Sequence, residues 1–407
     1  MSVGLSGPVN VIPLHIVSFS SVRLESLTYG LAMNREMLYQ QMAVTENWTY
    51  FDHAAVTPLP RSTAEAMTRI INEQATDGDV HWPAWRANVE SARQLGATLI
   101  GARTEEIALI RNTTEGIGLV ADGFPWEPGD NVVIPDSEFP SNLYPWKHLE
   151  NRGVEVRLLV CPDERLDLNR LDELCDDRTR IVSASWVGYA TGWRNDPKAI
   201  AEIAHRHGAL FFLDAIQALG VFPLDVEETG VDFLAADGHK WLLGPEGAGL
   251  FYIRREHLDR LNPLLVGWNS AATAGDYTNL ELTLKETAGR YEGGSYNMIG
   301  IAGLNNSLQL LADYGTENVA RDLLAVSDQL CVELESIGAH IASDRSDDHA
   351  SGIVAFTLPG RDTTELRKQL HKQGIVLRER AGRLRASPHV YNTSGDIGRL
   401  IAELEGA

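Results

Sequence analysis

Lys240 is the residue whose place in the sequence most favours chemistry. It lies in the segment DGHKW (237–241), directly after the largely apolar run Val231–Ala236 and before the Gly-rich stretch LLGPEGAG. An isolated lysine is ordinarily a solvated surface residue, but an amine at the end of a buried strand is partly desolvated. Desolvation lowers the pKa of an amine, and a neutral amine can form a Schiff base or accept a proton. Lys240 is therefore a candidate catalytic residue.

A carboxylate and a pair of hydroxyls follow two other apolar runs. Asp214 ends the run FFLD, and ligands bind at this edge of parallel α/β sheets. An Asp here can equally cap the next helix, whereas opposite a pyridine nitrogen it would keep that nitrogen protonated. Thr113 and Thr114 follow the run Ile107–Ile110 and open a helix, where hydroxyls and free N–H groups bind anions. The same threonines would also serve as ordinary helix caps.

The elements that must position these side chains form a repeating pattern from about residue 50 to 300, in which apolar runs alternate with amphipathic helices. Between two such runs, Pro197–His207 is helical by its 3.6-residue period and stops before Gly208. Strands that are apolar throughout are buried on both faces, which predicts an α/β fold with a mostly parallel sheet in a three-layer domain. The predicted strands are Asn131–Pro135, Val154–Val160, Thr179–Val187, Ala209–Ala215, Phe233–Ala236 and Gly249–Ile253.

The pattern changes beyond about residue 305. A long amphipathic helix is predicted over Glu317–Ile337, then a strand at Gly352–Leu358 and a helix that begins near Asp362. Two strands and a final helix from about Gly395 complete a smaller α+β domain. We therefore place a domain boundary near residue 300, with residues 50–300 in the large domain and residues 37–49 and 301–407 in the small one.

Composition and charge exclude several classes of protein. Of the 407 residues, 44% are hydrophobic and 22% are charged, as is ordinary for a soluble globular protein. The net charge of −21 disfavours nucleic acid and acidic membrane surfaces as partners. No apolar run approaches the roughly 18 residues that span a bilayer. The cysteines Cys161, Cys175 and Cys331 lie far apart, which argues against a disulfide framework or a metal cluster and fits the cytoplasm.

Residues 1–36 are expected to be an extension, either disordered or derived from a start upstream of Met33 or Met37. Within residues 1–32 the charged side chains are Arg23 and Glu25, so the basic segment of a secretory signal is missing. The hydroxyl-rich, acid-poor composition of this segment only weakly resembles that of a transit peptide.

The motifs NTTEG, LDxxQ and GHK occur in this order and resemble the class V aminotransferase and cysteine desulfurase family of pyridoxal-phosphate (PLP) enzymes. Further matching segments are YFDHAAVTPLP (50–60), EFPSN (138–142), RYEGGSYN (290–297) and RASPHVYNT (385–393). The resemblance covers about residues 48–407 and extends to the isopenicillin N epimerase-like branch. It implies PLP fold type I, PLP as cofactor and an amino acid as substrate.

The resemblance implies roles for the positions around the cofactor ring. Lys240 matches the lysine that carries PLP as a Schiff base and moves the Cα proton of the substrate. Asp214 matches the partner of the pyridinium nitrogen, and Gln217 matches the hydrogen-bond partner of the ring hydroxyl oxygen. Phe139 stands where many relatives stack a histidine on the ring. A phenyl group can stack there but cannot transfer a proton.

Other matching positions concern the phosphate. Thr113, Thr114 and His239 match phosphate contacts. Ser295 matches a hydroxyl that contacts the phosphate of the neighbouring subunit, which implies a homodimer with shared active sites. Many relatives have a phosphate-binding Ser three residues before the lysine, where this chain has Asp237. A carboxylate would repel a phosphate, so Asp237 is expected to point away or to act through a basic neighbour.

The substrate end of the site shows both a match and a departure. Arg385 matches the arginine that holds the α-carboxylate, and the resemblance adds His53 and Arg378 as substrate contacts. Cysteine desulfurases carry a thiolate nucleophile on a mobile loop between two arginines, but here the segment RERAGRLR (378–385) is short and lacks cysteine. Persulfide chemistry by the usual route is therefore disfavoured. Arg380 and Arg383 could meet a second acidic group on the substrate or be solvated loop charges.

These observations predict a PLP-dependent enzyme that acts on the Cα of an amino acid, as a class V aminotransferase or an epimerase-like enzyme. The alternative is a cysteine or cystine C–S lyase or a desulfurase-like activity. A more remote alternative is a non-catalytic scaffold with the same fold, which would have lost the cofactor positions that this chain retains. No metal site is expected.

Overall fold

The computed structural model describes residues 33–276, 278 and 280–406. The extension expected over residues 1–36 lies outside the described residues as far as residue 32. Asn34 then caps helix α1 (Arg35–Gln41), because its side chain accepts a hydrogen bond from the backbone N–H of Met37. Of the helices in the described residues, none is long and apolar enough to cross a membrane.

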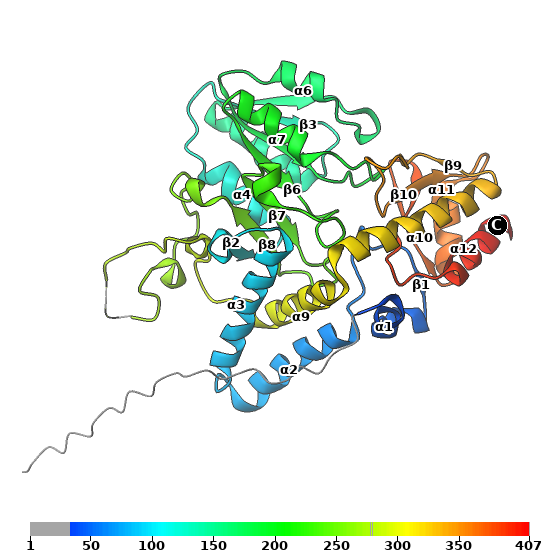
Figure 1. The fold of residues 1–407 in the computed structure, drawn as a ribbon, viewed down its shortest axis with the longest axis horizontal. Coiled ribbons are helices and arrows are strands. Elements are labelled where there is room, and N and C mark those ends of the chain that lie inside the picture. The colour runs from blue at the N-terminus through cyan, green and yellow to red at the C-terminus, as the bar shows by residue number, and fades with distance from the viewer. Residues whose placement is uncertain (1–32, 277, 279, 407) are drawn as a thin grey trace, which may run out of the picture. The chain divides into compact units, whose positions relative to one another are not determined.

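The central element is a seven-stranded sheet with the order β2-β8-β7-β6-β5-β3-β4 (Figure 1). Strands β4, β3, β5, β6 and β7 are parallel, whereas β8 pairs antiparallel with both β7 and β2. The mostly parallel sheet predicted from the apolar runs is therefore confirmed. Its strands are β2 (Ile107–Ile110), β3 (Asn131–Pro135), β4 (Glu155–Leu159), β5 (Thr179–Ser185), β6 (Leu210–Asp214), β7 (Phe233–Asp237) and β8 (Gly249–Ile253).

Each face of this sheet has its own hydrophobic core, because successive strand residues point to opposite faces. In β6, Phe211 and Leu213 join one core, whereas Leu210 and Phe212 join the other. The first core includes side chains of α3, α6, α7 and α9, and the second includes side chains of α4 and α5. Helices on both faces give the predicted three layers. These helices are α3 (Trp82–Leu99), α4 (Thr113–Gly123), α5 (Tyr144–His148), α6 (Leu168–Leu174), α7 (Pro197–Arg206) and α9 (Met298–Tyr314).

Strand β4 differs from the expectation that all these strands are buried on both faces. It pairs with β3 alone and forms an edge of the sheet, where Glu155 is exposed and Leu158 is 41% exposed. Arg157, in the middle of the strand, forms an ion pair of 2.7 Å with Asp176. Charged side chains of this kind protect an edge strand from pairing with other chains.

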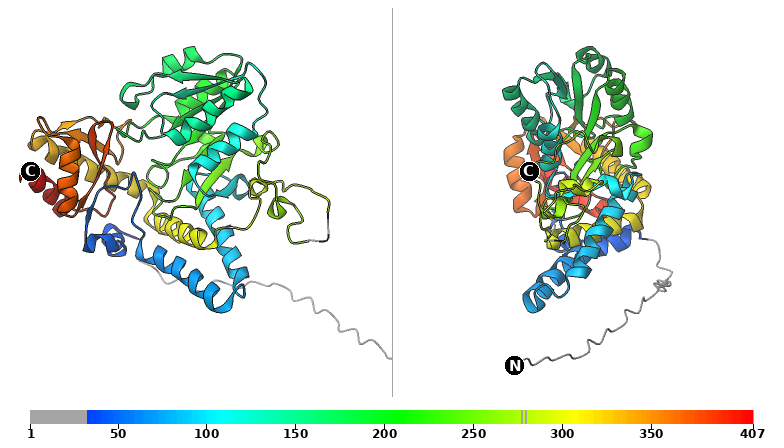
Figure 2. Two further views of the ribbon diagram at one scale, coloured as in Figure 1. Left: turned by 180° about the vertical axis from the view of Figure 1, so that it is seen from behind. Right: turned by 90° about the vertical axis from the view of Figure 1, so that its left-hand side faces the viewer.

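A second, smaller sheet of four antiparallel strands has the order β12-β13-β10-β9. It belongs to the C-terminal part of the chain, which is orange to red in Figure 2. Residues from α10, α11 and α12 form a third hydrophobic core with it. This is the predicted α+β pattern, while the boundaries at residues 50 and 300 remain a prediction. The elements are β9 (His340–Ile341), β10 (Val354–Thr357), β12 (Arg378–Arg380), β13 (Arg383–Ala386), α10 (Thr316–Ser336), α11 (Thr363–Lys372) and α12 (Ser394–Gly406).

Short strand pairings hold the segment near residue 50 beside the C-terminal part of the chain. Strand β1 (Thr49–Tyr50) pairs parallel with β11 (Ile375–Val376), so the residues that follow β1 run beside the C-terminal segment. Asp52, two residues beyond β1, forms a parallel bridge with Ser387. The remaining α-helices of the described residues are α2 (Arg61–Asp77) and α8 (Val226–Thr229).

Candidate active site

The carboxyl ends of β5, β6 and β7 open into one cavity of about 390 Å³. Ser185, Asp214 and Asp237 end these strands and line the cavity, and Thr113 adds the first turn of α4. Its volume is that of a small-molecule site. The residues predicted from the sequence that line it are Thr113, Thr114, Phe139, Asp214, Gln217, His239, Lys240, Arg378 and Arg385.

Lys240 is half-buried in the cavity wall. Burial lowers the pKa of its amine to about 8, with Asp214 acting against the shift and Arg385 adding to it. The Nζ atom lies 5.9 Å from the centroid of the Phe139 ring. That ring is 43% exposed, so an apolar face is open to the cavity beside the amine. Lys240 therefore combines a substantial neutral fraction near pH 8 with a neighbouring surface on which a planar ring can stack.

Asp214 is only 2% exposed at the end of β6. Burial raises the pKa of this carboxyl to about 6, while the backbone N–H of Ile216 (3.1 Å) and the charge of Lys240 work in the other direction. At neutral pH the group is thus mostly an anion, held in an apolar surrounding. Such an anion stabilises a protonated ring nitrogen placed against it.

Glu138 is a buried carboxyl near Asp214 that does not itself line the cavity and for which the sequence indicated no role. Its two oxygens contact the backbone N–H of Ser185 (2.6 Å) and the Ser185 hydroxyl, and Ser185 pairs with Asp214 across β5 and β6. Burial, with the nearby Asp214 as a second cause, raises the pKa of Glu138 to about 8. A protonated Glu138 leaves Asp214 as the anion of the two. The motif EFPSN contained this residue, but only the fold brings it to Asp214.

The first turn of α4 lines the cavity with Asn112, Thr113 and Thr114. Asn112 caps the helix by accepting from the backbone N–H of Glu115 (2.9 Å), and the N–H groups of Thr113 and Thr114 lie in the same turn, where helices bind anions. The Thr113 hydroxyl accepts from the backbone N–H of Asp237 (3.0 Å), which fixes α4 to the end of β7.

Asp237 contacts His239, while its expected effect on a bound phosphate stays a prediction. One of its oxygens lies 2.8 Å from Nδ1 of His239, an ion-pair distance without the alignment of a hydrogen bond. The other oxygen accepts from the backbone N–H of Gly238 (2.7 Å). Both oxygens of the Asp237 carboxylate therefore have a local contact, although Asp237 still lines the cavity.

Arg385 also lines the cavity. It is 1% exposed, and its guanidinium donates to the Tyr189 carbonyl (2.5 Å) and more weakly to Asp52 (3.4 Å). Arg378 donates to the other oxygen of Asp52 (2.7 Å). Burial lowers the pKa of Arg385 to about 10, against the charge of Asp52. Its buried Nε has no hydrogen-bond partner among the described residues, so one donor remains for an anionic ligand.

Two residues predicted for the site lie elsewhere. His53 is fully buried and does not line the cavity, because Nδ1 contacts the Ser387 carbonyl (3.0 Å) and Nε2 contacts the Tyr391 hydroxyl (2.9 Å). Burial lowers the pKa of His53 to about 4. Ser295 lines a second cavity of about 330 Å³ together with Arg111. Its predicted contact with a neighbouring subunit stays a prediction.

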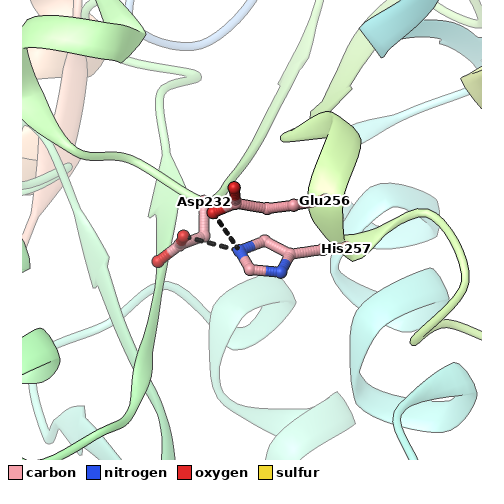
Figure 3. A group of neighbouring side chains, drawn as sticks. All are labelled: Asp232, Glu256 and His257. Atoms are coloured by element: carbon pink, nitrogen blue, oxygen red, sulfur yellow. Dashed lines mark hydrogen bonds and ion pairs between the residues drawn. The ribbon is translucent and has the colours of Figure 1, made fainter.

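Asp232, Glu256 and His257 form a cluster of residue types that commonly bind metal ions (Figure 3). Asp232 directly precedes β7, so the cluster lies near the amino end of that strand. Asp232 is 2% exposed and accepts from the side chains of His205 and His257 and from the backbone N–H of Phe211, each at 2.8 Å. Glu256 is exposed and lies 3.8 Å from His257. Because these donors already occupy both oxygens of Asp232, the group acts as a buried hydrogen-bonding centre.

The comparisons with known proteins agree with this geometry. The family model for aminotransferase class V matches residues 49–400. A probable cysteine desulfurase of Methanothermobacter thermautotrophicus is 30% identical over 400 residues, which cover 92% of this chain and 99% of the relative. A solved apo cysteine desulfurase of Thermococcus onnurineus has a TM-score of 0.84 at 27% identity, covering 92% of this chain and 99% of that one. The cystine C–S lyase C-DES, solved with cysteine persulfide, has a TM-score of 0.82 at 26% identity, covering 90% and 99%.

Fold and site together define a PLP-dependent enzyme of fold type I. The chain belongs to the aminotransferase class V family. Its cofactor is PLP, which is also the group covalently linked to glycine in a solved variant of C-DES. The relatives described here are named cysteine desulfurase or C–S lyase, so they do not specifically support the epimerase-like branch.

The residues of the cavity fit this cofactor. A partly neutral amine, a buried carboxylate and an open helix N-terminus are the groups needed for its aldehyde, ring nitrogen and phosphate. Gln217 donates to the Ala54 carbonyl (3.0 Å) and accepts from the Trp241 indole (2.9 Å), which fixes its amide. One N–H of that amide remains for the ring hydroxyl oxygen.

Proposed function

We propose that this enzyme cleaves the Cβ–S bond of a cysteine-derived amino acid without passing the sulfur to a cysteine of its own. The names of its relatives support carbon–sulfur chemistry and favour this alternative over the aminotransferase or epimerase that the sequence analysis put first. The single observation that carries the proposal is the cavity in which Lys240 and Asp214 lie together with Arg385 but with no thiol.

The three cysteines of the chain are poorly suited to accept sulfur. Cys161, Cys175 and Cys331 are all free and buried, and none lines the cavity. Burial raises the thiol pKa of Cys161 to about 12 and that of the other two to about 11. A thiol at such a pKa is almost never the thiolate that attacks sulfur. The free thiols also support the predicted cytoplasmic location.

The residues of the cavity can perform the elimination as follows. PLP, when bound, withdraws electrons from the substrate Cα and so acidifies its proton. The neutral amine of Lys240 accepts that proton, Asp214 holds the positive charge of the ring nitrogen, and Arg385 orients the α-carboxylate. The Cβ–S bond then breaks, and its electron pair leaves with sulfur, which can take a proton from the Lys240 ammonium. The released enamine hydrolyses to pyruvate and ammonia.

The test is to incubate the holoenzyme with L-cystine and to quantify the products. We expect pyruvate, ammonia and persulfide sulfur in equal amounts. Alanine in place of pyruvate would indicate desulfuration through an enzyme thiol. Lasting conversion of the cofactor to its amine form would indicate transamination. Either result would overturn the proposal.

Two controls accompany this test. Lys240→Ala is expected to lose the visible absorbance of the bound cofactor and to lower the rate by roughly 10³-fold, because the base is missing. Alkylation of the native holoenzyme with iodoacetamide is expected to leave pyruvate release unchanged, because the thiols are buried.

A further inference from the structure

The segment from Arg378 to Arg385 forms a β-hairpin with a tight turn. Strands β12 and β13 are joined by Ala381 and Gly382, whose φ angles are +48° and +72°. Two left-handed residues in a two-residue loop are typical of a tight type I′ turn, which fixes the register of both strands. Arg378 pairs with Arg385 and Arg380 pairs with Arg383 across this hairpin.

The four arginines lie on one face of the hairpin, because residues two apart and residues directly opposite share a face. Three of them have a carboxylate partner. Arg378 and Arg385 contact Asp52, and Arg383 forms an ion pair with Asp163 (2.8 Å). Asp163 lies outside the cavity lining.

Arg380 is the exception. It lines the cavity with Arg378 and Arg385, and it donates to the carbonyl of its neighbour Glu379 (3.0 Å). Among the described residues no carboxylate pairs with it. The Glu379 carboxylate accepts from the Thr364 hydroxyl (2.7 Å) instead. Arg380 therefore keeps guanidinium N–H groups that an anionic ligand in the cavity can use.

The charge of Arg380 also acts on the other groups of the cavity. Burial is the main cause of the lowered pKa values of Lys240 and Arg385, and Arg380 adds to both shifts. An anion bound at Arg380 would therefore be felt at the amine that accepts the proton. Three arginines of one hairpin thus line the cavity, and of these Arg378 is held by Asp52 at 2.7 Å, whereas Arg385 keeps an unpaired Nε and Arg380 has no carboxylate partner among the described residues.

We propose that Arg380 binds a second carboxylate at the side-chain end of the substrate, while Arg385 binds the α-carboxylate. This inference rests on the proposed function in that both use the same cavity. It names the substrate class as an amino acid with a distal carboxylate, of which L-cystine, with its second α-carboxylate, is one. A monocarboxylic amino acid such as S-methyl-L-cysteine would leave Arg380 without a partner.

The first experiment measures binding of unreactive ligands to the holoenzyme by calorimetry. Dicarboxylates from succinate to suberate have no amino group and cannot react, and the monomethyl ester of each is its matched control. We expect at least one dicarboxylate to bind roughly tenfold to a hundredfold more tightly than its ester, the effect of one charged hydrogen-bonding pair. Arg380→Gln is expected to remove this difference, and Arg380→Lys to restore part of it.

Arg383→Gln is the matched control, because it removes the same charge from the same hairpin but outside the cavity lining. It should keep the preference for the dicarboxylate. Equal affinities of diacid and ester in the unaltered enzyme would overturn the proposal, as would an equal loss in both variants. Thermal melting of each variant establishes that the hairpin is folded.

A second experiment compares kcat/KM for L-cystine and S-methyl-L-cysteine. The ratio of kcat/KM for L-cystine to kcat/KM for S-methyl-L-cysteine is expected to fall at least tenfold in Arg380→Gln, because only the value for L-cystine decreases. An unchanged ratio would overturn the proposal. If neither compound is cleaved, the proposed C–S chemistry fails. The calorimetric result then still decides whether Arg380 recognises a carboxylate, so the two failures are distinguishable.

Discussion

Burial shifts the pKa values of Lys240 and Asp214 in opposite directions. It lowers the pKa of Lys240 to about 8 and raises that of Asp214 to about 6. Both shifts have the same origin, because an apolar surrounding disfavours whichever form is charged. The result is a base that is partly neutral and an acid that is still mostly ionised near pH 7. This combination suits proton transfer at Cα under neutral conditions.

A first prediction concerns the pH dependence of cofactor capture by the apoenzyme. Only the neutral amine of Lys240 attacks the aldehyde, so the rate of covalent capture should rise with pH through about 8 and then level off. With a lysine of ordinary pKa, the rate of capture would keep rising up to a pH of roughly 10. Stopped-flow absorbance with added PLP measures this profile. A midpoint near that of ordinary lysine would contradict the burial argument.

Arg380→Gln extends this test to a neighbouring charge. Arg380 is one of the cations that lower the pKa of Lys240, so its removal should move the midpoint of the profile to higher pH. Arg383→Gln, which removes a charge outside the cavity lining, should leave the midpoint where it is.

At the scale of elements, strand β7 ends at Asp237 in the cavity, and the buried Asp232 directly precedes its first residue and stabilises the fold there. Asp232 accepts from two histidines and a backbone N–H. Burial alone would raise the pKa of Asp232, but these hydrogen bonds outweigh it and hold the pKa at about 2. Because the unfolded value is about 3.9, the stabilisation is complete above that pH and is lost as pH falls towards 2.

Asp232→Asn is therefore expected to lower the free energy of unfolding by about 3 kcal/mol at pH 7, since it removes the buried negative charge and replaces one of the two acceptor oxygens by an amide donor. Urea denaturation measures the loss. Glu256→Gln is the matched control, because Glu256 belongs to the same cluster (Figure 3) but is exposed, and its effect should stay within about 0.5 kcal/mol. Equal effects of the two changes would contradict the anchoring role.

The hairpin turn allows a test of backbone conformation without steric change. A Cβ at Gly382 or at Gly398 would meet no atom within 4 Å, but Gly382 has a φ of +72° and Gly398 lies inside α12. Gly382→Ala should therefore destabilise the protein by about 1 kcal/mol, and Gly398→Ala should stabilise it by about 0.5–1 kcal/mol. Thermal unfolding of both variants should show shifts of opposite sign. Two shifts of the same sign would contradict the turn geometry.

At the scale of the whole molecule, exposed apolar side chains line the second cavity. Ser295 lines it together with Leu265 and Val266, which are 59% and 48% exposed. Exposed apolar side chains that line a cavity are typical of an interface. We propose that this face is the dimer interface, so that Ser295 contacts the cofactor phosphate of the partner.

Leu265→Glu is expected to weaken the dimer at least roughly tenfold and to lower the affinity for PLP with it, because a charge would be buried in the interface. Sedimentation velocity measures the dimer, and fluorescence titration measures PLP binding. Val332→Glu places the same charge at another exposed apolar position, on α10, and should change neither. A monomeric unaltered enzyme with full PLP affinity would exclude the shared site.

The sequence by itself determined the central sheet and the groups at its edge. Apolar runs such as Asn131–Pro135 form strands because burial on both faces leaves them no amphipathic alternative. Once the strands are parallel, their carboxyl ends must lie at one edge. Asp214 and the Lys240 segment therefore had to meet in one place, although 26 residues separate them.

Tertiary structure alone decided which charges are compensated. The contact of Arg378 with Asp52 joins residues 326 positions apart, and local sequence patterns carry no signal for such a pair. The same holds for Glu138 beside Asp214, for the occupied ring nitrogens of His53, and for the different surroundings of Arg380 and Arg383. Local sequence fixes which side chains a strand presents. The free energy of a charge depends on what packs against it, and distant segments supply that partner only when the chain folds.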